Sequence, residues 1–181
     1  TPKELMKIVK GPDFPTGGII CGRQGIVDGY TTGRGRITVR GEVKVESGLR
    51  GNKEQIVITE IPYQVNKKGL VEQIAGLVKD DKIKDIADVR DESDRENLAR
   101  IVVELKRDAD PNVVINQLYQ YTPLQSTFSI INIALVNRQP RTLGLRDMIQ
   151  LFIDHRVEVI RRRTQFRLKK ARQRAHILEG L

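Results

Sequence analysis

Arginines and glycines alternate near the start of the chain, in the segment YTTGRGRITVRG (residues 30–41). Guanidinium groups bind phosphate, and glycines let a backbone approach a ligand closely. The segment therefore fits either a glycine-rich nucleotide-binding turn or a strand whose arginines contact a nucleic acid. The nucleotide alternative fits poorly, because GRGRIT lacks the third glycine of GxGxxG and precedes a strand-like run. No GxxxxGK followed by Ser or Thr occurs in the chain.

Strand geometry predicts how these arginines lie. Alternate side chains of a strand share a face, so Arg34, Arg36 and Arg40 should point to one side if the strand is regular from Arg34 onward. The neighbouring glycines are expected to let the backbone come close to a ridge of phosphates. We call Arg34, Arg36 and Arg40 the arginine strip, and we predict that it holds a nucleic acid.

The remaining chemically reactive residues predict no catalytic, cofactor-binding or metal-binding site. His155 and His176 are too far apart along one predicted helix to share a metal. Cys21 is the only cysteine, which excludes an internal disulfide and is compatible with a reducing cytoplasm. The acidic segment RDESDRE (residues 90–96) lacks the spacing of an EF-hand and is interrupted by arginine, which favours a solvated turn.

Positive charge is concentrated at the end of the chain. The net charge is +9, and residues 141–181 carry 11 basic and 4 acidic side chains, whereas residues 1–140 carry 21 and 19. Such asymmetry is typical of a nucleic-acid or membrane surface, with a merely solvated basic helix as the alternative. No segment approaches the ~20 apolar residues that span a bilayer. We therefore expect a cytoplasmic protein without a membrane partner.

The body of the chain predicts an α+β fold, a two-layer α/β sandwich. β-branched alternation predicts strands, and capping residues predict two helices, one after Asn66 that ends near Asp80 and one after Asp110 that ends near Tyr121. The predicted strands span residues 36–46, 54–61, 86–90, 99–106 and 128–137. The first two should form an antiparallel hairpin around a turn at residues 47–52.

After Pro140 the spacing of apolar residues changes from alternation to intervals of three or four, and this spacing continues to the end of the chain. This pattern predicts one long amphipathic helix from Leu145. At ~1.5 Å per residue it would extend roughly 55 Å, longer than any face of the sandwich. Much of its apolar stripe must therefore meet another surface. Because the chain begins without methionine and ends at HILEGL with no stop signal beyond Gly180, we expect it to be cut from a longer protein.

Five segments carry a resemblance to a known family. They are GPDFPTGG, YTTGRGRITVRG, ITEIPYQVNKKGLVEQI, VRDESDREN and RRRTQFRLKKARQRAHILEGL. Together they resemble the A subunits of type IIA DNA topoisomerases, those of bacterial DNA gyrase first and those of topoisomerase IV as a close second. The resemblance implies a linker from a missing breakage domain (residues 1–30), an α/β tower domain (31–140) and the start of the coiled-coil helix (141–181).

The resemblance also implies an activity for the parent enzyme. Such an isomerase hydrolyses ATP and changes DNA supercoiling by breaking, passing and rejoining duplexes, and each A subunit holds a broken end through a tyrosine that follows an arginine. Tyr30, Tyr63, Tyr119 and Tyr121 follow Gly, Pro, Leu and Gln, so none matches and we expect the fragment alone to be inactive. Mg²⁺ and ATP are implied for the partner B subunit. The implied partners are double-stranded DNA, a second A subunit in a heterotetramer, and the B subunit.

Two further pairs of basic residues join the arginine strip as candidate DNA contacts. Lys67 and Lys68 begin a predicted helix, and Arg138 and Arg141 flank the exit of the last predicted strand. Two other functions stay open. One is an RNA-binding α/β module, which the 4% aromatic content disfavours because few side chains could stack on bases. The other is a coiled-coil adaptor in which the sandwich is only a scaffold.

Overall fold

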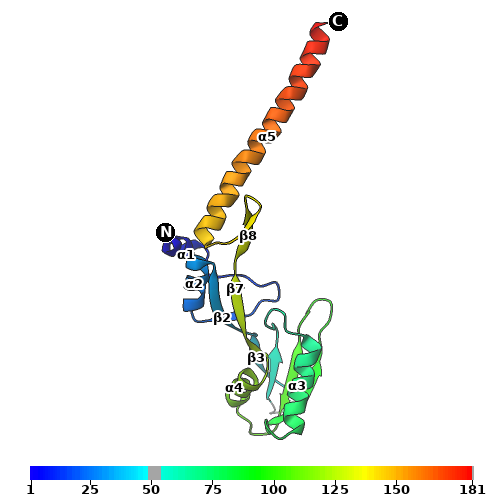
Figure 1. Ribbon diagram of the computed structural model, residues 1–181. Helices are drawn as coiled ribbons and strands as arrows, with labels where there is room; N and C mark the ends of the chain where they lie inside the picture. Colours follow the sequence, from blue (N-terminus) through cyan, green and yellow to red (C-terminus); the bar gives the residue numbers. More distant parts are fainter. Residues whose placement is uncertain (49–53, 181) are drawn as a thin grey trace.

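The computed structural model describes residues 1–48 and 54–180, which form two sheets with their helices, a hairpin and a long projecting helix (Figure 1). The predicted α+β class, the sandwich and the long helix are confirmed. The predicted turn at residues 47–52 lies mostly outside the described residues. None of the helices in the described ranges is long and apolar enough to cross a membrane.

The first part is a three-stranded antiparallel sheet in the order β1-β2-β7. Its strands are β1 (Ile19–Cys21), β2 (Arg34–Arg40) and β7 (Gln125–Ile131), and helices α1 (Pro2–Ile8) and α2 (Gln24–Thr32) accompany it. Side chains from α1, α2 and one face of the sheet share a small core: Met6, Ile26, Tyr30, Ile37, Val39 and Ile130. We call this the open sheet, because its other face has exposed side chains.

The second part is the sandwich. Its antiparallel sheet has the order β3-β4-β6-β5, with β3 (Val43–Ser47), β4 (Glu54–Ile58), β5 (Ile86–Asp91) and β6 (Ile101–Leu105). The helices are α3 (Lys67–Lys79) and α4 (Pro111–Tyr121). Leu70 and Ile74 of α3 and Val114 and Leu118 of α4 share one fully buried core with the strands, which places both helices on one face.

Both predicted helix caps of the sandwich are confirmed. The Asn66 side chain accepts a hydrogen bond from the Gly69 amide at 2.9 Å, and the Asp110 carboxylate accepts one from the Asn112 amide at 2.9 Å. Each cap satisfies an amide that has no partner within its own helix, which defines where the helix begins.

The third part is the hairpin of β8 (Ile133–Val136) and β9 (Gln139–Thr142), followed by α5 (Leu145–Glu179). Asn137 and Arg138 form the hairpin turn with φ of 52° and 65°. Figure 1 shows α5 extending from the hairpin far beyond both sheets. None of its described residues is buried, so its apolar stripe faces solvent in this chain.

Two predicted strands are wrong in detail. The run at residues 36–46 divides at Gly41 into β2 and β3, which lie in different sheets, because the Gly41 amide bonds to the Leu124 carbonyl and the chain crosses there from one sheet to the other. The run at residues 128–137 divides at Asn132 into β7 and β8, because β7 pairs with β2 whereas β8 pairs with β9, and the Asn132 carbonyl between them accepts a hydrogen bond from the Leu143 amide.

Candidate nucleic-acid interface

The open sheet presents one uncovered face. Residues 35, 37 and 39 of β2 point toward α2, and Ile37 and Val39 are buried there, whereas the arginine strip lies on the opposite face. The expectation that its arginines share a face is thereby confirmed. Across the strand pair, Arg34, Arg36 and Arg40 stand opposite Ile131, Ser129 and Gln125 of β7.

Arg34 and Arg36 are the free members of the strip. Both side chains are exposed, and neither forms an ion pair with any other described residue. Ser129 lies directly opposite Arg36, and Thr127 occupies the next position of the same face. Two cations beside two hydroxyl groups match the donors that bind phosphate oxygens in protein–DNA contacts.

Arg40 is held by the protein itself. Its Nε donates a hydrogen bond to Gln125 Oε1 at 2.6 Å, and its guanidinium lies 4.7 Å from the centroid of the Tyr119 ring. The side chain is half-buried. Arg40 therefore connects the open sheet to α4 of the sandwich, and Arg34 and Arg36 are the strip residues with free donors.

The glycines of the strip have a different role from the one expected. A Cβ on Gly35 would lie against the Gly25 carbonyl and 2.7 Å from the Gly29 amide, so Gly35 lets β2 and α2 touch. Gly33, with φ of +80°, ends α2 in the left-handed conformation. The expectation that these glycines admit a phosphate ridge is wrong, because their open sides are filled by the protein's own backbone.

Lys67 and Lys68 lie on the sandwich, and α3 is at the far end of the molecule from the β8–β9 hairpin (Figure 1). Lys67 Nζ is 3.2 Å from Asp91 Oδ2 and donates to the Leu98 carbonyl at 3.3 Å. Lys68 Nζ is 3.8 Å from Glu72 Oε1 and is exposed. Neither lysine belongs to the open sheet, and both have carboxylate partners.

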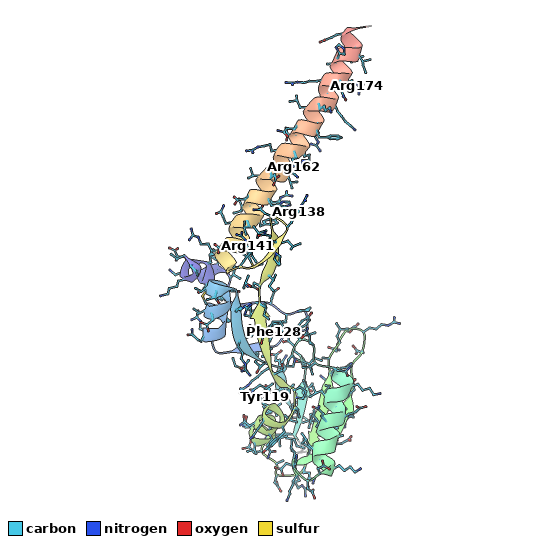
Figure 2. The ribbon with its side chains drawn as sticks, in the orientation of Figure 1. Tyr119, Phe128, Arg138, Arg141, Arg162 and Arg174 are labelled. Atoms are coloured by element: carbon cyan, nitrogen blue, oxygen red, sulfur yellow. The ribbon has the colours of Figure 1, made fainter. Side chains whose placement is uncertain are left out.

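Arg138 and Arg141 extend the open sheet toward α5. β7 runs into β8 through Asn132, so the hairpin continues the ribbon that carries Ser129. Arg138 is exposed at the hairpin turn, and Arg141 is exposed on β9 (Figure 2). Arg141 also lines a cavity of about 260 Å³ between the hairpin and α5. These two arginines share an end of the molecule with the strip.

The sandwich and the rest of the chain also differ in net charge. Residues 41–124, which include the sandwich, carry 13 basic and 16 acidic side chains. The rest of the chain, with the open sheet, the hairpin and α5, carries 19 basic and 7 acidic ones. A polyanion would therefore be attracted to the open sheet, the hairpin and α5, and repelled by the sandwich.

Ion pairs on the sandwich engage two of its arginines, Arg90 and Arg100. Arg100 lies 3.1 Å from Glu46 and 3.6 Å from Glu92, and Arg90 lies 2.8 Å from Glu92 and 3.2 Å from Glu104. The hydrogen bond from Arg100 lowers the pKa of Glu46 from its ordinary value, although partial burial opposes this shift. Carboxylates of the sandwich itself therefore neutralise the positive charges of these two arginines.

The tyrosines have structural roles or lie apart from other reactive groups. Tyr30 is buried in the core of the open sheet, and this burial raises the pKa of its hydroxyl. The Tyr119 hydroxyl donates to the Gly41 carbonyl at 3.0 Å, and Tyr63 stacks on Phe14 with ring centroids 5.8 Å apart. Tyr121 is exposed. Residues 1–48 and 54–180 include no group of three or more His, Cys, Asp or Glu side chains arranged for a metal ion.

Thr127 and Ser129 were not among the residues predicted from sequence. Their neighbour in the site, Arg36, comes from a strand far away along the chain, and the pairing of β2 with β7 creates the juxtaposition. The alternation in QSTFSII is the one local signal, because it indicates that Thr127 and Ser129 share a face of a strand.

These features define a class of protein: an α+β module with an open, basic sheet face, mounted on a long amphipathic helix. The family model for the A subunits of DNA gyrase and topoisomerase IV matches residues 1–181, and the chain belongs to this family. The resemblance drawn from the five sequence segments is thereby confirmed.

The chain is similar over nearly its whole length to curated A subunits of DNA gyrase. The A subunit of DNA gyrase from Aminobacterium colombiense is 58% identical over 178 residues, which are 98% of this chain and 22% of the relative. Those from Fibrobacter succinogenes and Pseudomonas aeruginosa are 56% and 55% identical over 100% and 99% of this chain, and in each case over 20% of the relative. The chain therefore spans about a fifth of the length of these relatives.

Proposed function

We propose that this chain is the DNA-contacting tower region of the A subunit of a type II DNA topoisomerase, specifically a gyrase. In this proposal residues 1–30 lead in from the breakage domain, residues 31–140 form the tower, and residues 141–181 begin the coiled coil. The family membership and the gyrase names of the relatives support this proposal.

One observation carries the DNA-binding role: Arg34 and Arg36 stand free on the uncovered face of the open sheet, with Thr127 and Ser129 beside them. Two residues along a strand span about 6.8 Å, so the two guanidinium groups can meet separate phosphates. Phosphate contacts fix the position of a duplex without reading its sequence. This suits an enzyme part that must hold DNA of any sequence.

The parent enzyme would break one duplex, pass a second through it and rejoin the first, with ATP hydrolysis. Its partners would be duplex DNA, a second A subunit, and a B subunit. This chain does not fit Mg²⁺ or ATP itself, since its described residues have no metal-binding cluster and its sequence has no phosphate-binding glycine loop. The B subunit would hold both groups, and we assign no reaction step to this chain.

Binding of a fluorescent 30-base-pair DNA duplex tests the proposal. We expect the chain to bind it, and we expect Arg34→Ala/Arg36→Ala to weaken binding by tenfold or more. Arg95→Ala/Arg107→Ala is the matched control, because it removes the same charge from exposed positions on the sandwich. Equal weakening by both variants would show a general charge effect and contradict a site on the open sheet. Preference for single-stranded RNA would favour the RNA-binding alternative.

A further inference from the structure

The row of side chains that carries Thr127 and Ser129 continues beyond the open sheet. Exposed and covered positions alternate without interruption from Thr127 to Val136, so the extended chain runs on from β7 into β8 although its pairing partner changes (Figure 1). Ile130 belongs to the core shared with α2, and Val136 lines the cavity beside α5, which marks their face as the covered one. The alternate residues keep to the uncovered face: Thr127, Ser129, Ile131, Ile133 and Leu135.

The last three residues of this face are apolar. Ile131, Ile133 and Leu135 are 57%, 58% and 75% exposed, and we call them the apolar row. Ile131 stands directly opposite Arg34 of β2, and Leu135 stands opposite Pro140 of β9, which is also exposed. Single exposed apolar side chains are common on proteins, whereas a contiguous apolar patch marks a binding surface. The apolar row is such a patch, and it continues the face that carries the arginine strip.

A duplex held by Arg34 and Arg36 would also lie over the apolar row. Neighbouring strands are about 4.8 Å apart, so Ile131 is one strand spacing from Arg34. A phosphate group has no apolar surface, and phosphate contacts therefore leave the apolar row unexplained. Each phosphate backbone borders a groove, in which deoxyribose and base edges offer apolar surface. The apolar row therefore fits a groove of the same duplex.

The chemistry of this face favours the minor groove. The major groove is read by amide, guanidinium and carboxylate side chains, or through the methyl group of thymine. Proteins that bind the minor groove instead insert apolar side chains such as Ile and Leu. A·T pairs present only hydrogen-bond acceptors in the minor groove, and the exposed hydroxyls of Thr127 and Ser129 can donate to them.

The spacing of the apolar row also matches a groove floor. Alternate residues of a strand repeat every ~6.8 Å, which equals two base steps of ~3.4 Å. The three side chains of the apolar row therefore span about four base steps. Regular contact with every second base pair is possible along this length, and it needs no distortion of the ribbon.

We propose that the apolar row lies in the minor groove of the duplex held by the arginine strip, so that this site favours A·T-rich DNA. The 2-amino group of guanine projects into the minor groove, where it would hold the apolar row away from the groove floor and would lose its hydrogen bonds to water. The minor groove distinguishes only A·T from G·C, so the preference is graded and requires no sequence motif. This inference rests on the proposed duplex binding by the open sheet.

Three fluorescent 30-base-pair duplexes test the inference with the full 181-residue chain. Their base pairs are all A·T, all G·C, or all inosine·cytosine. Inosine lacks only the 2-amino group of guanine, so an inosine·cytosine duplex combines the major-groove pattern of G·C with a minor groove that has no donor. We expect the A·T and inosine·cytosine duplexes to bind at least fivefold more tightly than the G·C duplex in anisotropy titrations.

The test variant is Ile131→Thr/Leu135→Thr, which removes both ends of the apolar row and keeps residues that strands accept. Its matched control is Ile8→Thr/Leu98→Thr, because these two side chains are each 81% exposed and belong to α1 and to a loop of the sandwich. We expect the test variant to lose the preference to below twofold and the control to keep it. The slope of log affinity against log salt should stay the same in both, because neither loses a phosphate contact. Thermal midpoints check the fold of each variant.

Three outcomes would overturn the inference. Equal binding of the three wild-type duplexes would show that no groove is read. Tight binding of A·T alone, with inosine·cytosine like G·C, would indicate contact with thymine methyl groups in the major groove. A preference that survives Ile131→Thr/Leu135→Thr would assign it to the arginines and assign the apolar row to a protein partner.

The arginine variant distinguishes failure of this inference from failure of the proposed function. Arg34→Ala/Arg36→Ala should weaken binding to all three duplexes and reduce the salt slope. If it does so while the apolar-row variant binds like the wild type, only the minor-groove contact is overturned. If Arg34→Ala/Arg36→Ala binds all three duplexes like the wild type, the function proposed for the open sheet is overturned and this inference with it.

Discussion

The guanidinium of Arg40 lies 4.7 Å from the centroid of the Tyr119 ring and links the end of the open sheet to a helix of the sandwich. The Tyr119 hydroxyl donates to the Gly41 carbonyl at 3.0 Å, one residue further along the chain. The Gly41 amide in turn bonds to the Leu124 carbonyl at 2.8 Å. These contacts gather where the chain crosses between the two sheets, so they hold the arginine strip in a defined orientation to the sandwich.

Replacing Tyr119 tests this junction. Tyr119→Phe removes one partly buried hydrogen bond and should lower the free energy of unfolding by about 1 kcal/mol. Tyr119→Leu also removes the cation–ring contact and should cost about 1 kcal/mol more. Tyr121→Phe is the control, since Tyr121 is exposed and its hydroxyl has no hydrogen-bond partner among the described residues. Urea unfolding measures all three variants, and equal losses at positions 119 and 121 would contradict the structural role of Tyr119.

Salt dependence tests how Arg34 and Arg36 bind DNA. If each neutralises one phosphate, Arg34→Ala/Arg36→Ala should reduce the slope of log affinity against log salt by about 1.8, at about 0.9 per phosphate. Two unrelated duplexes of equal length should weaken alike, because phosphate contacts carry no sequence information. Anisotropy titrations from low to moderate salt give the slope. An unchanged slope in a variant with an unchanged thermal midpoint would make both arginines solvated charges.

Two glycine substitutions should have opposite effects on stability. Gly35→Ala places a Cβ against the backbone of α2 and should destabilise the chain by about 1–3 kcal/mol, as overpacking does. Gly76→Ala, within α3, meets no atom within 4 Å and should stabilise by about 0.5–1 kcal/mol through helix propensity. Thermal unfolding compares them. Stabilisation by Gly35→Ala would show that β2 and α2 are not in close contact.

The ion pair between Glu46 and Arg100 predicts a pH effect. The folded chain lowers the pKa of Glu46 from 4.5, so its contribution is present at neutral pH and is lost as the pH falls below about 4.5. Glu46→Gln should therefore be less stable than the wild type at pH 7, by less than about 1 kcal/mol because the pair is partly exposed, and the difference should narrow by pH 3. Urea midpoints at both pH values measure it. If the stability difference between Glu46→Gln and the wild type widened at pH 3, the lowered pKa of Glu46 in the folded chain would be contradicted.

Incubation with supercoiled DNA, Mg²⁺, ATP and a gyrase B subunit should yield no covalent adduct of this chain. The reason is that none of its tyrosines follows an arginine, and the hydroxyls of Tyr30 and Tyr119 are buried or bonded within the fold. Denaturing gels after protease digestion detect nicked or linear DNA. A DNA-linked peptide that contains any of the four tyrosines would contradict this expectation.

Sequence alone determined the elements whose signals are local. The caps at Asn66 and Asp110, the strands β5 and β6 and the 35-residue helix α5 all depend on residues within a few positions of one another, so their patterns could be recognised directly. The family was also determined by sequence, because five segments occur in the order of the family. Helices α1 and α2 were not predicted, and QGIVDGYTT in α2 contains two glycines that weaken its helical pattern.

Only the tertiary structure decided which strip residues are free and what the glycines do. Arg40 is bound by Gln125, 85 positions away, and by Tyr119 of α4, whereas Arg34 and Arg36, which look alike in the sequence, keep their donors exposed. Gly35 is required because α2 packs on β2, and a local pattern of glycines cannot distinguish that use from an approach to phosphate. The physical reason is the same in both cases. The residues that bind the arginine side chain and the helix that packs against the glycine come from distant parts of the chain, and only folding brings them together.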